Sequence, residues 1–308
     1  MAYKDINIYK YLRFLVKRKL YFFIQRLEPI WRFINKEGVK EFYNIVFSSK
    51  ELKIANCLKK EGFAVFDIYD LFEESAETIF TDLKKRVEIL KNNPEILANK
   101  KGSKDFFTHL SGVPPLLDIE SPEIKLAYSA PLLNIASLYF GFVPRLHNTG
   151  FILTHTIPEG AKPAHSQRWH RDPEDKKILK VFVYLSDVDE GAGPLHYVSE
   201  SNHKGKWRRV FPQEPPAGSY PPEGAVEKKI PPKYIKRGVG KAGTIVFGDT
   251  SGLHKGGYAT QKERLQLWIG YVSLASFSPP KFIYPENFEE KIKALGSIQR
   301  YALKKWPS

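Results

Sequence analysis

The sequence is poor in cysteine: Cys57 is the single one among 308 residues. One thiol cannot form a disulfide within the chain, and it cannot build a zinc or iron–sulfur site from cysteines. A chain without disulfides fits a reducing compartment, so we expect a cytoplasmic protein. In such a protein Cys57 is expected to fill the core rather than act as a nucleophile.

Long apolar runs are also missing. The best run near the start, Leu20 to Ile24, has five residues, whereas a membrane-spanning helix needs about 20. Charges at Lys10, Arg13 and Lys17 interrupt the region before it, so we expect no secretory signal. The pattern predicts a protein that is soluble or at most bound to a membrane surface.

Acidic residues are scarce relative to basic ones: 34 Asp and Glu stand against 48 Lys and Arg, a net charge of +14. Residues 1–60 hold fourteen basic and five acidic side chains, so +9 of this charge lies there. Such a balance favours an anionic membrane or acidic small molecules as partners. Nucleic acid is not expected, because no zinc-finger spacing, RNA-binding aromatic motif or basic-region heptad accompanies the charge.

Residues 1–60 are predicted to form a basic amphipathic helical segment, with a break at Glu28-Pro29. Apolar residues at spacings of three and four define one face of its first helix: Leu12, Val16, Leu20, Phe23 and Leu27. This face can make peripheral contact with an anionic membrane, or it can pack against the main domain. The second interpretation is favoured, because apolar helix faces usually find protein.

A β-rich domain is expected over residues 61–285, with helical support in its first part. From Gly141 onwards, short runs rich in β-branched and aromatic residues recur between Gly, Pro and Asp; they span 143–157, 164–172, 178–188, 194–199, 243–249, 252–258 and 263–274. Recurring strands without intervening helices favour an antiparallel sandwich or barrel, and an α+β, mainly β, fold class. Residues 286–308 are predicted to form a final amphipathic helix.

Residues 204–241 interrupt the strand pattern. They hold ten basic and three acidic residues and three proline pairs. A structureless insertion of this length in a compact domain is usually a lid or binding loop. Two interpretations stay open: a lid that closes over an anionic substrate, or a solvated loop.

The chemistry of the chain centres on His170-x-Asp172. Residues two apart on a strand share a face, so an imidazole and a carboxylate lie side by side. His254 lies among glycines at 252, 256 and 257, where a backbone can approach a ligand closely. Two histidines and one carboxylate leave three open positions on one side of an octahedral metal, which is typical of non-haem iron(II) oxygenases.

Arg264 follows His254 by ten residues and begins an apolar strand. A turn of this length can return the chain beside His254. The Arg264 guanidinium could then bind the far carboxylate of 2-oxoglutarate with two hydrogen bonds.

These motifs resemble the phytanoyl-CoA dioxygenase family over about residues 141–275. Two further segments carry the resemblance: Gly191-Ala192-Gly193-Pro194-Leu195 and Ser201-Asn202-His203-Lys204. The resemblance implies a double-stranded β-helix, a cupin-like jelly roll. The N-terminal helices, which the resemblance does not cover, are expected to pack on it. It implies ferrous iron and 2-oxoglutarate as cofactors, dioxygen as co-substrate, ascorbate as a stimulant, and succinate and carbon dioxide as products.

The same resemblance assigns roles to residues of this chain. His170, Asp172 and His254 would be the metal ligands and catalytic residues, and Arg264 would hold the co-substrate carboxylate. Phe182 matches a cofactor-lining aromatic position. Lys180 and Tyr184 share its strand face and are weaker candidates for the same cavity.

One departure from the family is Gly256, which stands where a small hydroxyl residue is often found, so a second hydrogen bond to the co-substrate must come from elsewhere. Related halogenases lack the carboxylate ligand, whereas Asp172 is present, which favours hydroxylation of an unactivated C–H bond. Desaturation, epimerisation or halogenation on the same centre, and a non-catalytic metal-binding jelly-roll module, remain as alternatives. The substrate and the oligomeric state are not predicted.

Other polar residues have more than one interpretation. Asp249 can orient a ligand or cap a turn. Trp169 is expected to face away from the two ligands that flank it. His109 and His203 are expected to be structural or surface residues.

Overall fold

The computed structural model of the protein describes residues 8–93, 104, 106–213, 220–280 and 282–306. Its strands are β1 (Phe63–Asp67), β2 (Phe107–His109), β3 (Arg145–Thr154), β4 (Leu179–Tyr184), β5 (Leu195–Val198), β6 (Ile235–Gly238), β7 (Thr244–Asp249), β8 (His254–Lys255) and β9 (Arg264–Val272). Its helices are α1 (Ile8–Arg26), α2 (Glu28–Ile34), α3 (Lys36–Phe42), α4 (Ser49–Glu61), α5 (Ile68–Phe72), α6 (Ala76–Lys91), α8 (Pro122–Ala127), α9 (Ala130–Phe140), α10 (Ala225–Lys229), α11 (Phe288–Lys293) and α12 (Ser297–Leu303). Short 3-10 turns cover Glu73–Ser75, His165–Gln167, Glu190–Ala192 and Pro232–Tyr234.

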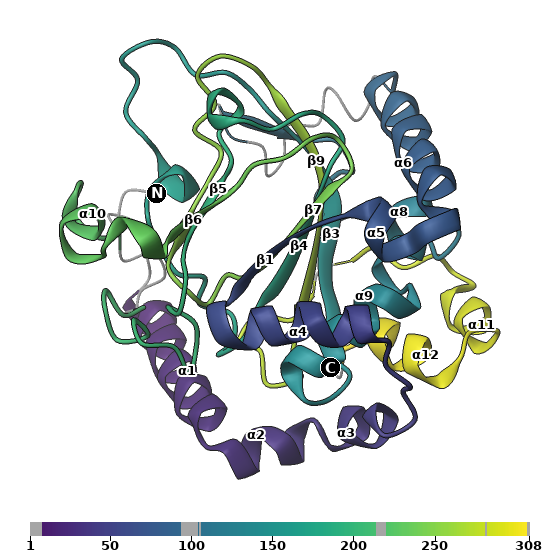
Figure 1. Cartoon of the computed structure of the whole chain (residues 1–308). Coiled ribbons are helices and arrows are strands. Elements are labelled where there is room, and N and C mark those ends of the chain that lie inside the picture. Colours follow the sequence, from purple (N-terminus) through teal and green to yellow (C-terminus); the bar gives the residue numbers. More distant parts are fainter. Residues whose placement is uncertain (1–7, 94–103, 105, 214–219, 281, 307–308) are drawn as a thin grey trace.

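The strands of the described residues form two antiparallel sheets. The larger sheet has the order β1-β7-β4-β9-β3-β2, and the smaller one has the order β6-β5-β8. Figure 1 shows α6, α8, α9, α11 and α12 on one side of the larger sheet and β5 and β6 on the other. This is the double-stranded β-helix arrangement, so the expected α+β, mainly β, jelly-roll fold is confirmed.

Two apolar layers hold these parts together. The main core joins the larger sheet to the helices that cover it, with Leu83, Ile135, Val181 and Ile269 fully buried. A smaller core lies between the two sheets and contains Tyr184, Tyr197 and Val246. Strands β4 and β7 are buried on both faces, which explains why their sequences read as nearly continuous apolar runs.

Helix α4 shows how local sequence sets the boundaries of an element. Ser48 and Glu51 form a capping box, in which each side chain accepts a hydrogen bond from the other residue's backbone N–H. The helix ends at Gly62, whose φ of 74° lies in the left-handed region that favours glycine. The chain then enters β1 directly, which places α4 against the edge of the larger sheet.

Three boundaries differ from expectation. Residues 164–172 are mostly irregular, with a 3-10 turn at His165–Gln167 and a single bridge at His170. The insertion 204–241 is only partly irregular, because it contains α10 and β6. The C-terminal stretch forms two helices rather than one, since Gly296 separates α11 from α12.

Helix α1 packs on the domain, as expected, but through the face opposite to the expected one. Gln25 is 3% exposed and donates hydrogen bonds to the backbone oxygens of Glu174 and Ala275. The apolar face points to solvent, with exposed fractions of 66% at Val16 and 61% at Phe23. Among the residues described, no helix is both long and apolar enough to cross a bilayer.

Candidate metal centre

His170, Asp172 and His254 converge on one point. One potential ligand atom from each lies within 4.8 Å of the other two. The Nε2 atoms of His170 and His254 each lie 3.7 Å from an oxygen of Asp172. The expected three-residue cluster is therefore present, although its members are 84 residues apart at the extremes.

Backbone pairing brings the two histidines together. His170 and His254 form an antiparallel bridge in which each N–H donates to the other's carbonyl oxygen at 2.9 Å. The N–H of Asp172 then donates to the carbonyl oxygen of Thr250 at 2.8 Å. Backbone hydrogen bonds thus join both His170 and Asp172 to the segment around β8.

The two imidazoles are oriented in the same way. Nδ1 of His170 lies 2.8 Å from the carbonyl oxygen of Arg168, and Nδ1 of His254 lies 3.0 Å from that of Gly252. A carbonyl oxygen only accepts, so each Nδ1 carries the proton and each Nε2 keeps its lone pair for a metal. Burial lowers the pKa of His254 to about 3 and also lowers that of His170, so both rings are neutral near pH 7.

Asp172 is held as a carboxylate. Burial opposes its ionisation, but Lys180, His254 and His170 outweigh this and lower its pKa well below the usual value. Nζ of Lys180 donates to Oδ2 of Asp172 at 2.7 Å. Lys180 therefore lies at the cavity, as expected, and it contacts a candidate metal ligand directly.

This donor set fits a divalent transition metal. Two neutral imidazole nitrogens and one carboxylate oxygen suit ferrous iron, and one side of such an ion would stay open. Thiolate ligands, which would favour structural zinc, do not contribute, because the one cysteine lies in α4.

A cavity of about 270 Å³ adjoins the three residues and contains Arg264. Arg264 is 5% exposed; it donates to the carbonyl oxygen of Gly193, and its Nη2 lies 3.4 Å from Oγ1 of Thr154. Its Nε has no partner within the described residues. A buried guanidinium with unused donor capacity is suited to an anionic ligand.

The remaining sequence-predicted residues divide into two groups. Phe182 and Lys180 line the cavity, as expected. Tyr184 does not line it: this side chain is fully buried in the smaller core and donates to the carbonyl oxygen of Gly238 at 2.5 Å. Tyr184 shares a strand face with Lys180 and Phe182, but it is the last residue of β4 and lies beyond the end of the cavity.

Several lining residues escaped the sequence analysis. Phe106 and Phe107 come from the segment of β2, Thr154 from the end of β3 and Trp268 from β9. His109 of β2, which was expected to be a structural or surface residue, also lines the cavity. Burial, and then Lys104, lowers the pKa of His109 to about 4. No spacing relative to His170 marks these residues, because they come from strands that meet the site only after the sheet has formed.

The insertion 204–241 reaches the centre through Tyr220. The Tyr220 and His170 rings are 5.9 Å apart, and the guanidinium of Arg168 lies 4.7 Å from the Tyr220 ring. On the other side, Trp169 packs away from the metal ligands, as expected, and donates to Oε1 of Glu227 in α10 at 2.7 Å.

Asp249 caps a turn rather than contacting a ligand. It is fully buried, and its Oδ1 accepts from the backbone N–H groups of Ile178 and Ser251, both at 3.0 Å. Oδ2 accepts from the hydroxyl of Tyr139. The Asp249 side chain thereby fixes the turn that leads from β7 to His254.

No protein-family model and no curated protein matches the sequence. Solved structures do resemble it. EctD from S. alaskensis in its apoform is 18% identical, with 85% of each chain covered and a TM-score of 0.51. EctD with 2-oxoglutarate and 5-hydroxyectoine is 17% identical over 79% of this chain and 83% of that one, with a TM-score of 0.51.

A further similar structure is SnoK, described as a non-heme alpha ketoglutarate dependent carbocyclase from nogalamycin biosynthesis. It is 14% identical over 80% of this chain and 90% of that one, with a TM-score of 0.50. At these identities the likeness shows a shared fold. The resemblance to the phytanoyl-CoA dioxygenase family therefore stays a prediction.

Proposed function

We propose that this protein is an iron(II)- and 2-oxoglutarate-dependent dioxygenase that hydroxylates an unactivated C–H bond of a small organic substrate and releases succinate and carbon dioxide. One observation carries the proposal: His170, Asp172 and His254 converge at one cavity that also contains the buried guanidinium of Arg264. The structural likeness to EctD, in a structure that contains 2-oxoglutarate, is consistent with it.

The protein's part is to bind and orient. His170 and His254 would offer Nε2, and Asp172 would offer a carboxylate oxygen. Bound ferrous iron with 2-oxoglutarate would supply dioxygen activation. Lys180 keeps Asp172 ionised and in place, so it is a positioning residue for the metal ligand.

Arg264 would bind the far carboxylate of 2-oxoglutarate. Gly256 offers no hydroxyl for a second contact, but Oγ1 of Thr154 lies beside the Arg264 guanidinium and lines the same cavity. We assign the second hydrogen bond to Thr154, because a hydroxyl can donate to a carboxylate while accepting from the arginine.

The walls of the cavity would exclude water from the substrate. Phe106, Phe107 and Trp268 provide apolar surface, and Tyr220 covers the His170 side from the insertion. The insertion's excess of Lys and Arg favours a substrate that carries negative charge.

Succinate release tests the proposal. Purified protein with ferrous iron, 2-oxoglutarate, ascorbate and dioxygen is screened against small anionic and neutral substrates, and product masses are recorded. We expect succinate from the wild type and none from His170→Ala, with a product heavier by one oxygen atom. A product that has lost two hydrogens would indicate desaturation. A wild type that forms no succinate and binds zinc tightly would instead favour the non-catalytic metal-binding module.

A further inference from the structure

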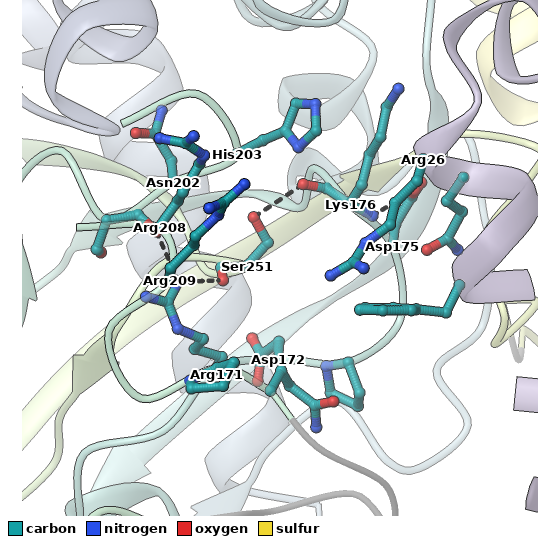
Figure 2. Close-up of a pocket in the computed structure, with 16 residues that line it drawn as sticks. Arg26, Arg171, Asp172, Asp175, Lys176, Asn202, His203, Arg208, Arg209 and Ser251 are labelled. Carbon is teal, nitrogen blue, oxygen red and sulfur yellow. Dashed lines mark hydrogen bonds between the residues drawn. The ribbon is translucent and has the colours of Figure 1, made fainter. Parts of the chain in front are cut away.

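A second cavity, of about 390 Å³, lies between α1 and the loop that follows β5 (Figure 2). Basic side chains from three segments line it: Arg26, Arg171, Lys176, His203, Arg208 and Arg209. Asp172 lines this cavity as well as the one at the metal centre, so the two adjoin.

Two of these cations already have partners. Nζ of Lys176 lies 2.7 Å from Oε2 of Glu28. Arg171 is buried, and its guanidinium donates to five carbonyl oxygens, four of which belong to residues 201–211. Arg171 and Lys176 therefore support the walls of the cavity: Arg171 has no N–H donor left for a ligand, and the charge of Lys176 is paired with Glu28.

The other three arginines lack acidic partners. Within the described residues, no carboxylate pairs with Arg26, Arg208 or Arg209. The Arg26 guanidinium stacks 3.7 Å above the ring of Phe22, and its pKa is lowered by burial and then by Arg209. Figure 2 shows Arg208 and Arg209 on the side opposite Arg26. Like charges thus face one another across the cavity.

The two acidic residues in the lining do not neutralise these arginines. Asp172 pairs with Lys180. Asp175 is buried, and it accepts from the backbone N–H groups of Lys176 at 2.7 Å and Ser273 at 2.8 Å. The cavity therefore keeps an excess of positive charge.

We propose that this cavity is a binding site for a phosphate group on a small organic or lipid ligand, separate from the 2-oxoglutarate site. Planar guanidinium groups bind phosphate oxygens in pairs, and a phosphate would relieve the repulsion among Arg26, Arg208 and Arg209. The volume leaves room for an organic group beside the phosphate.

Calorimetric titration with inorganic phosphate, in the absence of metal and 2-oxoglutarate, tests this site independently of the proposed function. We expect saturable binding that weakens with added salt and drops about tenfold or more in the double variant Arg208→Gln/Arg209→Gln, a loss of about 1.4 kcal/mol or more. Arg300→Gln, a change to an exposed arginine on α12, is the matched control and should bind as the wild type does.

Two outcomes would overturn the proposal: no saturable phosphate binding by the wild type, or equal binding by the wild type and the double variant. Competition distinguishes the sources of the phosphate. Displacement of bound phosphate by glycerol 3-phosphate, but not by phosphatidylglycerol vesicles, identifies a free metabolite. The reverse result identifies a lipid headgroup.

A different observation concerns the outward face of α1. Every member of its apolar face is exposed: Leu12 is 52% exposed, Val16 66%, Leu20 54%, Phe23 61% and Leu27 36%. The helix is attached through its other side, where Phe14 and Tyr21 pack edge-on against Phe277. Leu12, Val16, Leu20 and Phe23 of α1 and Leu27 just after it form a stripe that contacts solvent, here called the outer stripe.

Basic residues flank the outer stripe on both sides. On a helix of 3.6 residues per turn, Arg13 and Lys17 lie along one edge, and Lys19 and Arg26 lie along the other. All four are exposed. An apolar stripe between two basic edges matches a surface of acyl chains beneath anionic headgroups. A second copy of the chain would bring the same positive charges together.

We infer that the outer stripe docks on the surface of an anionic bilayer, with α1 lying parallel to it. Co-sedimentation with vesicles tests this inference. We expect binding to vesicles of phosphatidylcholine with phosphatidylglycerol, weaker binding to phosphatidylcholine alone, and a further loss at high salt.

The variant Leu20→Glu/Phe23→Glu should reduce vesicle binding at least tenfold, because it places charge on the outer stripe, while thermal unfolding stays unchanged. The control Ile89→Glu alters a residue on α6 that is 62% exposed and should leave vesicle binding as it is. A wild type that ignores anionic vesicles would overturn the inference. So would a concentration-dependent dimer that the Leu20→Glu/Phe23→Glu change abolishes.

Discussion

At the metal centre, the side-chain atoms available to a metal or an anion are those that make no hydrogen bond to neighbouring residues. The histidines use Nδ1 on backbone carbonyl oxygens, which reserves Nε2 for a metal, and Arg264 keeps its Nε unpaired at a buried position. Each of these atoms would be costly to bury without a ligand, because an unsatisfied buried polar group loses its hydration. This arrangement suits the binding of a metal and an anion, as proposed above.

Arg264→Gln should weaken the binding of 2-oxoglutarate by roughly 1.5–3 kcal/mol, since it removes a charge-assisted contact in a buried site. This corresponds to a dissociation constant raised about 10- to 150-fold. Thr154→Val, which removes one hydrogen bond to the same carboxylate but leaves the arginine's charge in place, should cost about 1.5 kcal/mol, at the lower end of this range. Calorimetry on metal-loaded protein measures both. Unchanged affinity in the arginine variant, with folding intact, would remove Arg264 from its role.

His147 gives a prediction on pH. It is 9% exposed, its Nε2 lies 2.9 Å from the carbonyl oxygen of Ser278, and burial lowers its pKa from 6.5 to about 4. The folded protein therefore keeps the ring neutral where the unfolded chain takes up a proton. The stabilisation is full above pH 6.5 and is lost as pH falls towards 4.

The size of that loss is roughly 3 kcal/mol, because one pKa unit corresponds to about 1.36 kcal/mol. Urea denaturation of the wild type and His147→Gln at pH 7.5 and pH 5 measures the part of this loss that falls between pH 6.5 and pH 5, which is roughly 2 kcal/mol. We expect the free energy of unfolding to fall more steeply towards acid in the wild type than in the variant. Parallel slopes for the two proteins would contradict the assignment.

At the scale of elements, the sequence predicted which residues share a face better than it predicted where that face points. The periodicity of Leu12, Val16 and Leu20 was interpreted correctly as one side of a helix, but that side faces solvent. The helix instead buries Arg18 and Gln25, which are 5% and 3% exposed. Periodicity alone cannot reveal this, because polar side chains can be buried when backbone groups elsewhere in the fold satisfy them.

The candidate site was predictable where its residues lie close in sequence to a recognisable motif. His170 and Asp172 share a strand-like spacing, and the glycines around His254 mark a close approach. Thr154 and Trp268 were missed, because they line the cavity only through the pairing of β3 with β9. Tyr184 was misplaced for the related reason that strand alternation does not show where the strand leaves the cavity.

Arg171 links two elements and offers a prediction at this scale. Its guanidinium ties the loop of residues 201–211 to the segment that holds His170 and Asp172. Lysine cannot reproduce this fork of donors, so Arg171→Lys should leave several carbonyl oxygens unpaired and destabilise the protein by about 2–4 kcal/mol.

Limited proteolysis and denaturant unfolding test the Arg171→Lys change. Cleavage within residues 201–213 should become faster before the rest of the chain is attacked. Arg168→Lys, an exchange at a neighbouring arginine that contacts Tyr220, serves as the control. Equal cleavage rates in both variants would show that the loop does not depend on Arg171.

For the whole molecule, a metal that binds only the folded state must raise its stability. At a concentration about 100 times the dissociation constant, the gain is about 2.7 kcal/mol. For a chain of this size we expect the melting temperature to rise by about 5 °C. Thermal unfolding with ferrous iron under anaerobic conditions measures the shift, which should vanish in His254→Ala. An equal shift in that variant would place the metal elsewhere.

The mutual backbone bridge between His170 and His254 has a consequence for how the protein matures. Strands β4 to β7 lie between its two halves in the sequence, and neither half can present a complete set of ligands before these strands have paired. An incompletely folded chain would thus be unable to bind the ion, and only fully folded molecules would acquire the metal.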